Sequence, residues 1–325
     1  MSKMKEPSYL PPFTVTAKAI NLVAEISALI ERYAIRLEKS DGLLLRKVNR
    51  IKTIHSSLAI EGNKLSEDQV RDIIDGKNVI APLREIQEVK NAMKTYELYP
   101  KLNPFNEKDL LKAHGVMMNS LTDDAGRFRH GGVGVFAGEK CVHLAPPATR
   151  VPFLIGDLFD WLKHSKDHLL IRSCVFHYEF EFIHPFSDGN GRMGRMWQTL
   201  LLMQWKPIFA WLPVETIVKE NQQKYYDAIA LSDKQGNSTA FITFMLKCIL
   251  ASLKEMCESN QKSNQKSNQK VLSAISENPD ITIKELQTLI GLSESGIKKI
   301  LRQLRNDGVI VRIGGAKGGH WEILK

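Results

Sequence analysis

The sequence predicts a mainly α-helical fold, in which a helical core carries a β-hairpin and a small winged helix-turn-helix domain follows at the C-terminus. Three observations lead to this prediction. Apolar residues recur with helical spacing from about Thr16 to Glu258. Two short β-prone runs surround a glycine-containing turn between Val133 and His143. Beyond residue 268, short helical patterns lead into a second hairpin.

The composition is that of a soluble globular protein, since 43% of the 325 residues are hydrophobic and 25% are charged. No apolar run reaches the roughly 20 residues that a membrane-spanning helix needs, and the first residues lack the apolar region of a signal peptide. The four cysteines are scattered and show no metal-ligand spacing. We therefore expect a cytoplasmic protein with reduced thiols and no membrane partner.

Four segments are expected along a chain of this length. They are an N-terminal helical region over residues 1–110, a core over 111–258, a linker over 259–268 and the winged helix domain over 269–325. The linker contains a repeated Asn-Gln-Lys-Ser sequence, which is polar and offers no apolar face for packing.

In the N-terminal region we expect an amphipathic helix that starts near Asp41. Gly62 would cap its end, because glycine readily adopts the left-handed conformation that closes a helix. Ser57 and Glu61 then lie in the last turns of this helix.

The first hairpin is expected around Val133, Gly134, Val135 and Phe136. An exposed strand edge at this place would hold an extended peptide through main-chain hydrogen bonds, with little dependence on the peptide's sequence. A hairpin without any partner is the alternative interpretation.

The segment from His184 to Arg195 concentrates the chemistry of the chain, and it lies between two apolar stretches that are typical of buried helices. Pro185 cannot continue a helix. The stretch Gly189–Gly191 tolerates positive φ and close backbone approach. Because the next helix begins near Gly191, its free N–H groups face the same spot. We therefore predict an anion site, and a polyphosphate fits it best.

Side chains of three kinds complete this site. Arg192 and Arg195 are able to make bidentate contacts with phosphate oxygens. Asp188 would repel phosphates unless it holds Mg²⁺, which prefers one or two carboxylates plus phosphate oxygens. His184 lies outside the turn and is placed to accept a proton from an incoming hydroxyl.

The C-terminal pattern of helices over about 269–277, 283–290 and 293–306, followed by a hairpin, resembles a winged helix-turn-helix. The cations of its third helix that lie off the buried stripe, where DNA phosphates would reach them, are Lys298, Lys299, Arg302 and Arg305. Winged helices also serve as protein-docking or homodimer modules, so DNA binding and docking both stay open.

The segment from His184 to Arg195 resembles the signature of the Fic family, His-x-Phe-x-(Asp/Glu)-Gly-Asn-Gly-Arg-x-x-Arg, at every fixed position. The resemblance implies an all-α core and transfer of AMP from ATP to a Ser, Thr or Tyr hydroxyl of a protein, self-modification included. It implies that His184 is the general base and Asp188 the Mg²⁺ ligand. The residues that it implies for binding the phosphates of ATP are Gly189, Asn190, Gly191, Arg192 and Arg195. The family's kinase branch has Ala and Lys inside the loop, so the glycines here favour adenylyl transfer.

Three further segments resemble parts of the same family. Ser57–Asn63 is similar to its inhibitory helix, Ser/Thr-x-x-x-Glu-Gly/Asn, whose Glu pairs with the second arginine and blocks the γ-phosphate; here these are Glu61 and Arg195. The hairpin at 133–143 resembles the flap that holds the target. The residues implied on the adenine side are Tyr225, Tyr226 and Asp233. Asp233 stands where many members have Asn, and a carboxylate accepts from the adenine amino group but cannot donate to a ring nitrogen.

Two alternatives remain open on the sequence. The same site is able to remove AMP from a modified protein, with Glu61 orienting a water, as occurs in some members of the family. A non-enzymatic alternative is a DNA-binding regulator that uses nucleotide occupancy as a signal.

Overall fold

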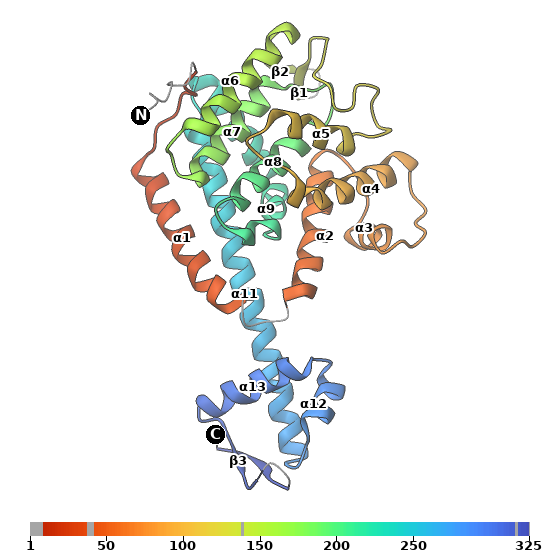
Figure 1. The fold of residues 1–325 in the computed structure, drawn as a ribbon, viewed down its shortest axis with the longest axis vertical. Coiled ribbons are helices and arrows are strands. Elements are labelled where there is room, and N and C mark those ends of the chain that lie inside the picture. The colour runs from red at the N-terminus through yellow and green to blue at the C-terminus, as the bar shows by residue number, and fades with distance from the viewer. Residues whose placement is uncertain (1–8, 38–41, 138–139, 316–317, 325) are drawn as a thin grey trace. The chain divides into compact units, whose positions relative to one another are not determined.

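The fold is mainly helical in a computed structural model that describes residues 9–37, 42–137, 140–315 and 318–324 (Figure 1). The chain divides into two compact units. The first comprises Met1–Glu31 and Leu43–Leu253, and the second comprises Arg32–Gly42 and Lys254–Lys325. Within the described residues, every helix is too short or too polar to cross a lipid bilayer.

The helices of the first unit follow from the periodic apolar residues of the sequence. Their bounds are α1 Ala17–Leu37, α2 Gly42–Ile60, α3 Glu67–Ile74, α4 Leu83–Glu97, α5 Glu107–Met117, α6 Val151–His164, α7 Leu169–Ile183, α8 Asn190–Met203, α9 Val214–Glu220 and α10 Gln222–Gln235. Short 3₁₀ turns cover Tyr99–Lys101, Ala148–Arg150 and Pro207–Ala210.

The centre of the first unit is the pair α7 and α8, which pack against each other. Most residues of α7 are buried on all sides of the helix, as its almost continuous apolar sequence predicts. The short connection between these two helices, residues 184–189, contains the first half of the predicted anion site.

The end of α2 has the geometry that the sequence predicts. Gly62 has φ +92°, and its N–H bonds to the Ala59 carbonyl at 3.1 Å while the Asn63 N–H bonds to the Leu58 carbonyl at 3.1 Å. This pair of bonds is a Schellman motif, which satisfies the last free carbonyls of the helix. The expected start near Asp41 lies outside the described residues, and α2 is described from Gly42.

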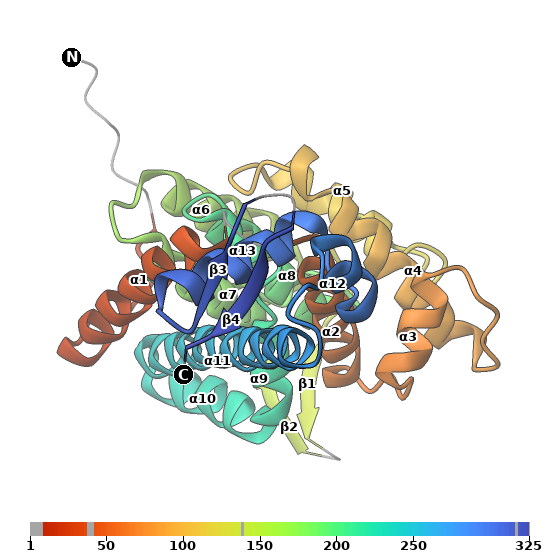
Figure 2. The same cartoon turned by 90° about the horizontal axis from the view of Figure 1, so that it is seen from below.

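The first hairpin is present as β1 Gly134–Ala137 and β2 Lys140–Leu144. The strands are antiparallel, with Val135 opposite His143, and a register shift follows Val135. Figure 2 shows the hairpin projecting from the edge of the helical unit. Each sheet in the described part of the chain has two strands, so one edge of β1 has no strand paired to it there.

The segment expected as a linker, residues 259–268, is helical, because α11 runs without interruption over Thr239–Glu277. The helix expected from Gln269 is therefore the end of α11. The physical reason is that the repeat contains no proline or glycine, and Gln and Lys are good helix formers. A polar composition without helix breakers does not stop a helix.

The second unit continues with α12 Ile283–Ile290, α13 Glu294–Asn306, β3 Ile310–Ile313 and β4 His320–Ile323. Thr282 caps α12 in a capping box with Glu285, and Ser293 caps α13, each with its side-chain oxygen on a free N–H group. This order of helices and hairpin is the predicted winged helix-turn-helix.

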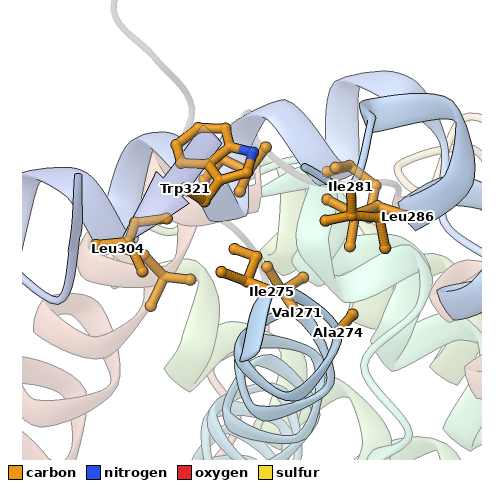
Figure 3. Packing of buried hydrophobic residues seen from close by; sticks show 10 residues of the cluster. Val271, Ala274, Ile275, Ile281, Leu286, Leu304 and Trp321 are labelled. Atoms are coloured by element: carbon orange, nitrogen blue, oxygen red, sulfur yellow. The ribbon is translucent and has the colours of Figure 1, made fainter. Parts of the chain in front are cut away.

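One apolar cluster holds the winged helix together (Figure 3). Val271 and Ile275 of α11, Leu286 of α12, Leu304 of α13 and Trp321 of β4 turn toward one another. The stripe of α13 is buried as its spacing predicts, and the four cations expected to lie off it are exposed.

We predict that Leu286→Ala destabilises the winged helix by about 2–5 kcal/mol, because this leucine is fully buried and its loss leaves a cavity. Leu289→Ala is the matched control, since Leu289 of the same helix is 64% exposed. Amide hydrogen exchange of peptides from residues 280–310 of the full chain is the measurement. Equal exchange rates in the two variants would contradict the assigned core.

Candidate active site

The loop between α7 and α8 has an unusual backbone at its first residue. His184 adopts φ 49° and ψ 63° directly after α7 ends. This left-handed conformation costs a non-glycine residue about 1–2 kcal/mol. Gly189 has φ 83° just before α8 begins, and glycine adopts that conformation without penalty. Strained residues persist where their surroundings hold them in place.

Arg129 holds His184 in this conformation. It is 3% exposed, and its guanidinium donates to backbone carbonyls, with a distance of 2.7 Å from Nε to the His184 oxygen. The other carbonyls that accept from this guanidinium are those of Gly131, Pro146 and Ile183. Burial lowers the pKa of Arg129, and each charged hydrogen bond offsets part of that cost. No motif of the sequence indicated this role for Arg129.

The orientation of the His184 ring suits a base. Its Nδ1 lies 3.3 Å from the backbone carbonyl of Glu181. A carbonyl oxygen only accepts, so Nδ1 carries the proton in this contact and Nε2 keeps the lone pair. The side chain is half-buried. The loop therefore leaves the Nε2 nitrogen of His184 able to receive a proton.

His114 packs against the loop, and no motif of the sequence indicated this role. Its ring stacks on Phe186 with centroids 3.6 Å apart. Nδ1 accepts from the Gly126 N–H at 2.9 Å, so Nε2 carries the proton and donates to the Asp188 carbonyl at 3.1 Å. Burial lowers the pKa of His114 to about 4, and the ring stays neutral near pH 7. Phe186 is fully buried and anchors the loop in the core.

Asn190 closes the loop with its side chain. Its Oδ1 accepts from the Phe186 N–H at 2.9 Å and its Nδ2 donates to the Phe186 carbonyl at 2.8 Å. Both ends of the amide thus bond to the backbone of Phe186 inside the loop, and the backbone N–H of Asn190 lies in the first turn of α8. The first N–H groups of α8 have no carbonyl partner within the helix, and they form the positive end of its dipole.

Asp188 lies between two arginines. Its Oδ1 accepts from Arg192 at 3.0 Å and its Oδ2 from Arg84 at 3.0 Å, while Glu88 lies 3.6 Å from both guanidinium groups. The Asp188 side chain is 42% exposed. Arg192 is buried, and its Nε has no hydrogen-bond partner among the described residues. Arg84 and Glu88 belong to α4, and no sequence motif singled them out.

A single carboxylate at this place fits a divalent cation that takes its other ligands from phosphate oxygens and water. Among the described residues, no group of three or more His, Cys, Asp or Glu side chains gathers as a metal site. Asp188 would thus hold Mg²⁺ only together with a bound polyphosphate.

Glu61 and Arg195 meet across α2 and α8. Arg195 Nη2 lies 2.8 Å from Glu61 Oε1 and 3.0 Å from the Ser57 carbonyl, and its Nε donates to the Ser57 hydroxyl at 3.2 Å. Burial is the largest single influence and lowers the pKa of the Arg195 guanidinium, but Glu61, Tyr225 and Glu181 together outweigh it and the pKa is raised. The pairing that the family resemblance implies is therefore present in the geometry.

Gly191 is required for a reason that differs from the expected positive φ. It belongs to α8, and a Cβ there would lie 2.4 Å from Glu61 Oε1 and 2.9 Å from Arg195 Nη1. The absence of a side chain at this position gives Glu61 its place beside Arg195. Of the three residues expected to tolerate positive φ, only Gly189 uses it.

The residues expected on the adenine side divide into two groups. Tyr225 is 2% exposed and its hydroxyl lies 3.1 Å from His177 Nε2, so it packs in the core and offers no face to a base. Tyr226 is 42% exposed and is the one placed to stack. Asp233 already accepts from the Tyr178 hydroxyl at 2.8 Å.

The winged helix is a separate unit with its own charged surface. A groove with a volume of about 830 Å³ lies over α12, α13 and the second hairpin, and Lys298, Arg302 and Arg305 line it together with Trp321. Lys298 also lies 2.5 Å from Glu294, one helical turn earlier. Lys299 is exposed as well. The unit thus presents cations as predicted, at modest density.

Comparison with known proteins agrees with this geometry. The Fic/DOC family model matches residues 104–202, and a model described as a winged helix-turn-helix DNA-binding domain matches residues 265–311. A solved Fic family protein from Desulfovibrio desulfuricans G20 is 44% identical, with a TM-score of 0.76 over 97% of this chain and 98% of that one. The chain therefore belongs to the Fic family.

More distant relatives share less of the chain. A protein named protein adenylyltransferase Fic from Culex quinquefasciatus is 32% identical over 210 residues, which are 61% of this chain and 40% of that protein. The chain thus spans about two fifths of the length of the curated relatives it matches. A solved fragment of Fic-1 from C. elegans, 22% identical over 77% of this chain and 74% of its own, has a TM-score of 0.62 and shares the fold.

We predict that His114→Gln changes how stability depends on pH. The pKa of His114 is about 4 in the folded protein against an ordinary 6.5, so the unfolded chain takes up the proton first. The stability that the neutral ring contributes is present above pH 6.5 and is lost as the pH falls toward 4, by on the order of 3 kcal/mol. The variant keeps a donor but has no titrating group.

Urea denaturation of both proteins between pH 4 and 8 measures this difference. The free energy of unfolding of the variant should be lower than that of the wild type at pH 7.5, and the gap should narrow as the pH falls. Comparing the two proteins cancels the contribution of other titrating groups. Parallel curves over the whole range would contradict a neutral, buried His114.

Proposed function

We propose that this chain is a protein adenylyltransferase that transfers AMP from ATP to a Ser, Thr or Tyr hydroxyl of a protein. One observation carries the proposal. His184 is held with its Nε2 lone pair available, at the start of the short loop that leads into the free N–H groups of α8, the helix that carries Arg192 and Arg195. A base next to a polyphosphate site is what such a transfer requires. The names of the relatives support the same activity.

The reaction follows from these positions. The target hydroxyl oxygen attacks the α-phosphorus, and the new P–O bond forms as the bond from that phosphorus to the bridging oxygen of the β-phosphate breaks. His184 Nε2 takes the hydroxyl proton, and pyrophosphate leaves. The free N–H groups in the first turn of α8 and the guanidinium of Arg192 stabilise the negative charge of the phosphates. Catalysis thus rests on positioning and electrostatics.

Magnesium belongs to the proposal on the chemistry of Asp188. Its carboxylate would share the ion with phosphate oxygens, and the ion would neutralise charge on the leaving pyrophosphate. Every other contact with the phosphates is made by groups of the chain itself.

Autoinhibition by Glu61 is the second part of the proposal. Support comes from the 2.8 Å contact between Glu61 and Arg195, which occupies the arginine that would otherwise meet the γ-phosphate. Since Arg195 is buried, removing Glu61 leaves an uncompensated charge that favours an anionic partner. The hairpin β1–β2 supports a docking role for the target, through the strand edge that its own partner strand leaves open.

We predict that Glu61→Gly raises the labelling of protein by ATP with a tagged adenine, because Arg195 becomes available to the γ-phosphate. Adding His184→Ala to this variant should abolish labelling, and ATP binding measured by calorimetry should remain. His164→Ala in the same background is the control, since His164 is a solvent-accessible histidine of α6. Labelling that survives the loss of His184 would refute its role as base.

Mass spectrometry of the Glu61→Gly protein after incubation with ATP and Mg²⁺ would identify self-modification and the residue that bears AMP. The reverse reaction has its own assay, in which a modified target is supplied and released AMP is measured. Release that depends on Glu61 would favour hydrolysis, with Glu61 orienting a water, over transfer.

DNA binding by the winged helix is a second candidate function, favoured by the exposed cations of α13. We predict that changing Lys298, Lys299 and Arg302 to Ala weakens binding to duplex DNA and lowers the slope of log affinity against log salt by about one per lost phosphate contact. The control changes Lys101, Lys108 and Lys163, which are exposed on the first unit and carry the same charge. An absence of binding at low salt would exclude this function.

A further inference from the structure

One of the two cations that pair with the candidate metal carboxylate does not come from the signature loop. Arg84 of α4 places Nη2 3.0 Å from Asp188 Oδ2, and its Nη1 donates weakly to the Leu121 carbonyl at 3.4 Å. Its side chain is 58% exposed, so the guanidinium reaches the site from the solvent side. Neither the sequence motif nor the family match over residues 104–202 includes this residue.

Arg84 occupies the oxygen that a divalent cation would need. Oδ1 of Asp188 is already taken by Arg192 and by the Gly189 N–H, and Oδ2 by Arg84. A guanidinium and a divalent cation cannot share one carboxylate oxygen without strong repulsion. In the proposed reaction, Arg84 must therefore leave Asp188 when ATP binds together with its divalent cation.

The displaced guanidinium has a position to move to. Glu88, one turn further along α4, lies 3.6 Å from Arg84 Nε and 3.6 Å from Arg192 Nη1. It keeps Arg84 close to Arg192, at the side of the site where the phosphates beyond the α-phosphate would lie. An exposed ion pair such as Arg84–Asp188 contributes no more than about 1 kcal/mol, so exchanging it for phosphate oxygens is favourable.

We propose that Arg84 is a phosphate-binding residue for the pyrophosphate part of ATP, and that Asp188 holds it in place when the site carries no nucleotide. The proposal rests on the proposed function, because it requires ATP at this loop. It adds a contact from α4, so the site is completed by a helix outside the segment that carries the signature. Discrimination of ATP from AMP would then depend on Arg84.

The test is a set of binding measurements by calorimetry in the Glu61→Gly background, with ATP, pyrophosphate and AMP as probes, each with Mg²⁺. Arg84→Ala should weaken ATP and pyrophosphate binding by about tenfold or more, the value of a charged hydrogen bond. AMP binding should not change. Arg71→Ala is the control, because Arg71 is an exposed arginine paired with Asp68 and Glu67 on α3.

A double-mutant cycle with Asp188→Ala separates binding from mere positioning. If Arg84 binds the phosphates directly, Arg84→Ala weakens pyrophosphate binding as much in the Asp188→Ala background as in the protein that keeps Asp188. Both proteins with Asp188→Ala are measured in metal-free buffer. Loss that disappears in the Asp188→Ala background would mean that Arg84 only orients Asp188, and an unchanged affinity in Arg84→Ala would overturn the proposal outright. If the Glu61→Gly protein binds none of the three probes, the proposed function itself fails.

Discussion

The site depends on the buried guanidinium of Arg129. Left-handed backbone at His184 is unfavourable by itself, and the end of the preceding helix would otherwise fray. Arg129 removes these options because its donors are spread over carbonyls on both sides of the loop, including those of His184 and Pro146. Its backbone N–H also bonds to Pro185 at 3.0 Å. In the described residues, these hydrogen bonds of the Arg129 guanidinium go to backbone carbonyls and not to a carboxylate. The charge of Arg129 therefore fixes the orientation of the His184 side chain.

Much of this arrangement could be predicted from sequence because it is local. The loop, the helix after it and the cap at Gly62 each depend on residues within one or two turns, and their backbone requirements are visible in Pro and Gly. Exposure of the cations on α13 follows from helical spacing in the same way. The Glu61–Arg195 contact is not local, and it was reached only through the family resemblance.

The parts that were missed depend on tertiary contacts that carry no local signal. Arg129, His114 and Arg84 act on the loop from 55, 74 and 104 residues away in sequence, and nothing in their neighbours distinguishes them from other polar residues. The tyrosine pair shows the same limit, because the helical pattern places two adjacent tyrosines on different faces without saying which face is buried. The continuous α11 is a different case, in which a polar repeat was interpreted as a linker before a new helix although no residue there breaks a helix.

Under the proposed function, the charges around the first turn of α8 would make the site select polyphosphates. Each arginine there already has a carboxylate: Arg195 has Glu61, and Arg192 has Asp188 with Glu88 nearby. An entering anion must therefore replace existing partners rather than meet free cations. A single phosphate group can replace one carboxylate but not several, whereas a chain of three phosphates has enough oxygens to meet the helix N-terminus and both arginines together. Under the proposed function, selectivity for ATP would come from these carboxylate–arginine pairs as much as from the donors themselves. The carboxylates that compensate buried charge would also exclude anions too small to replace them.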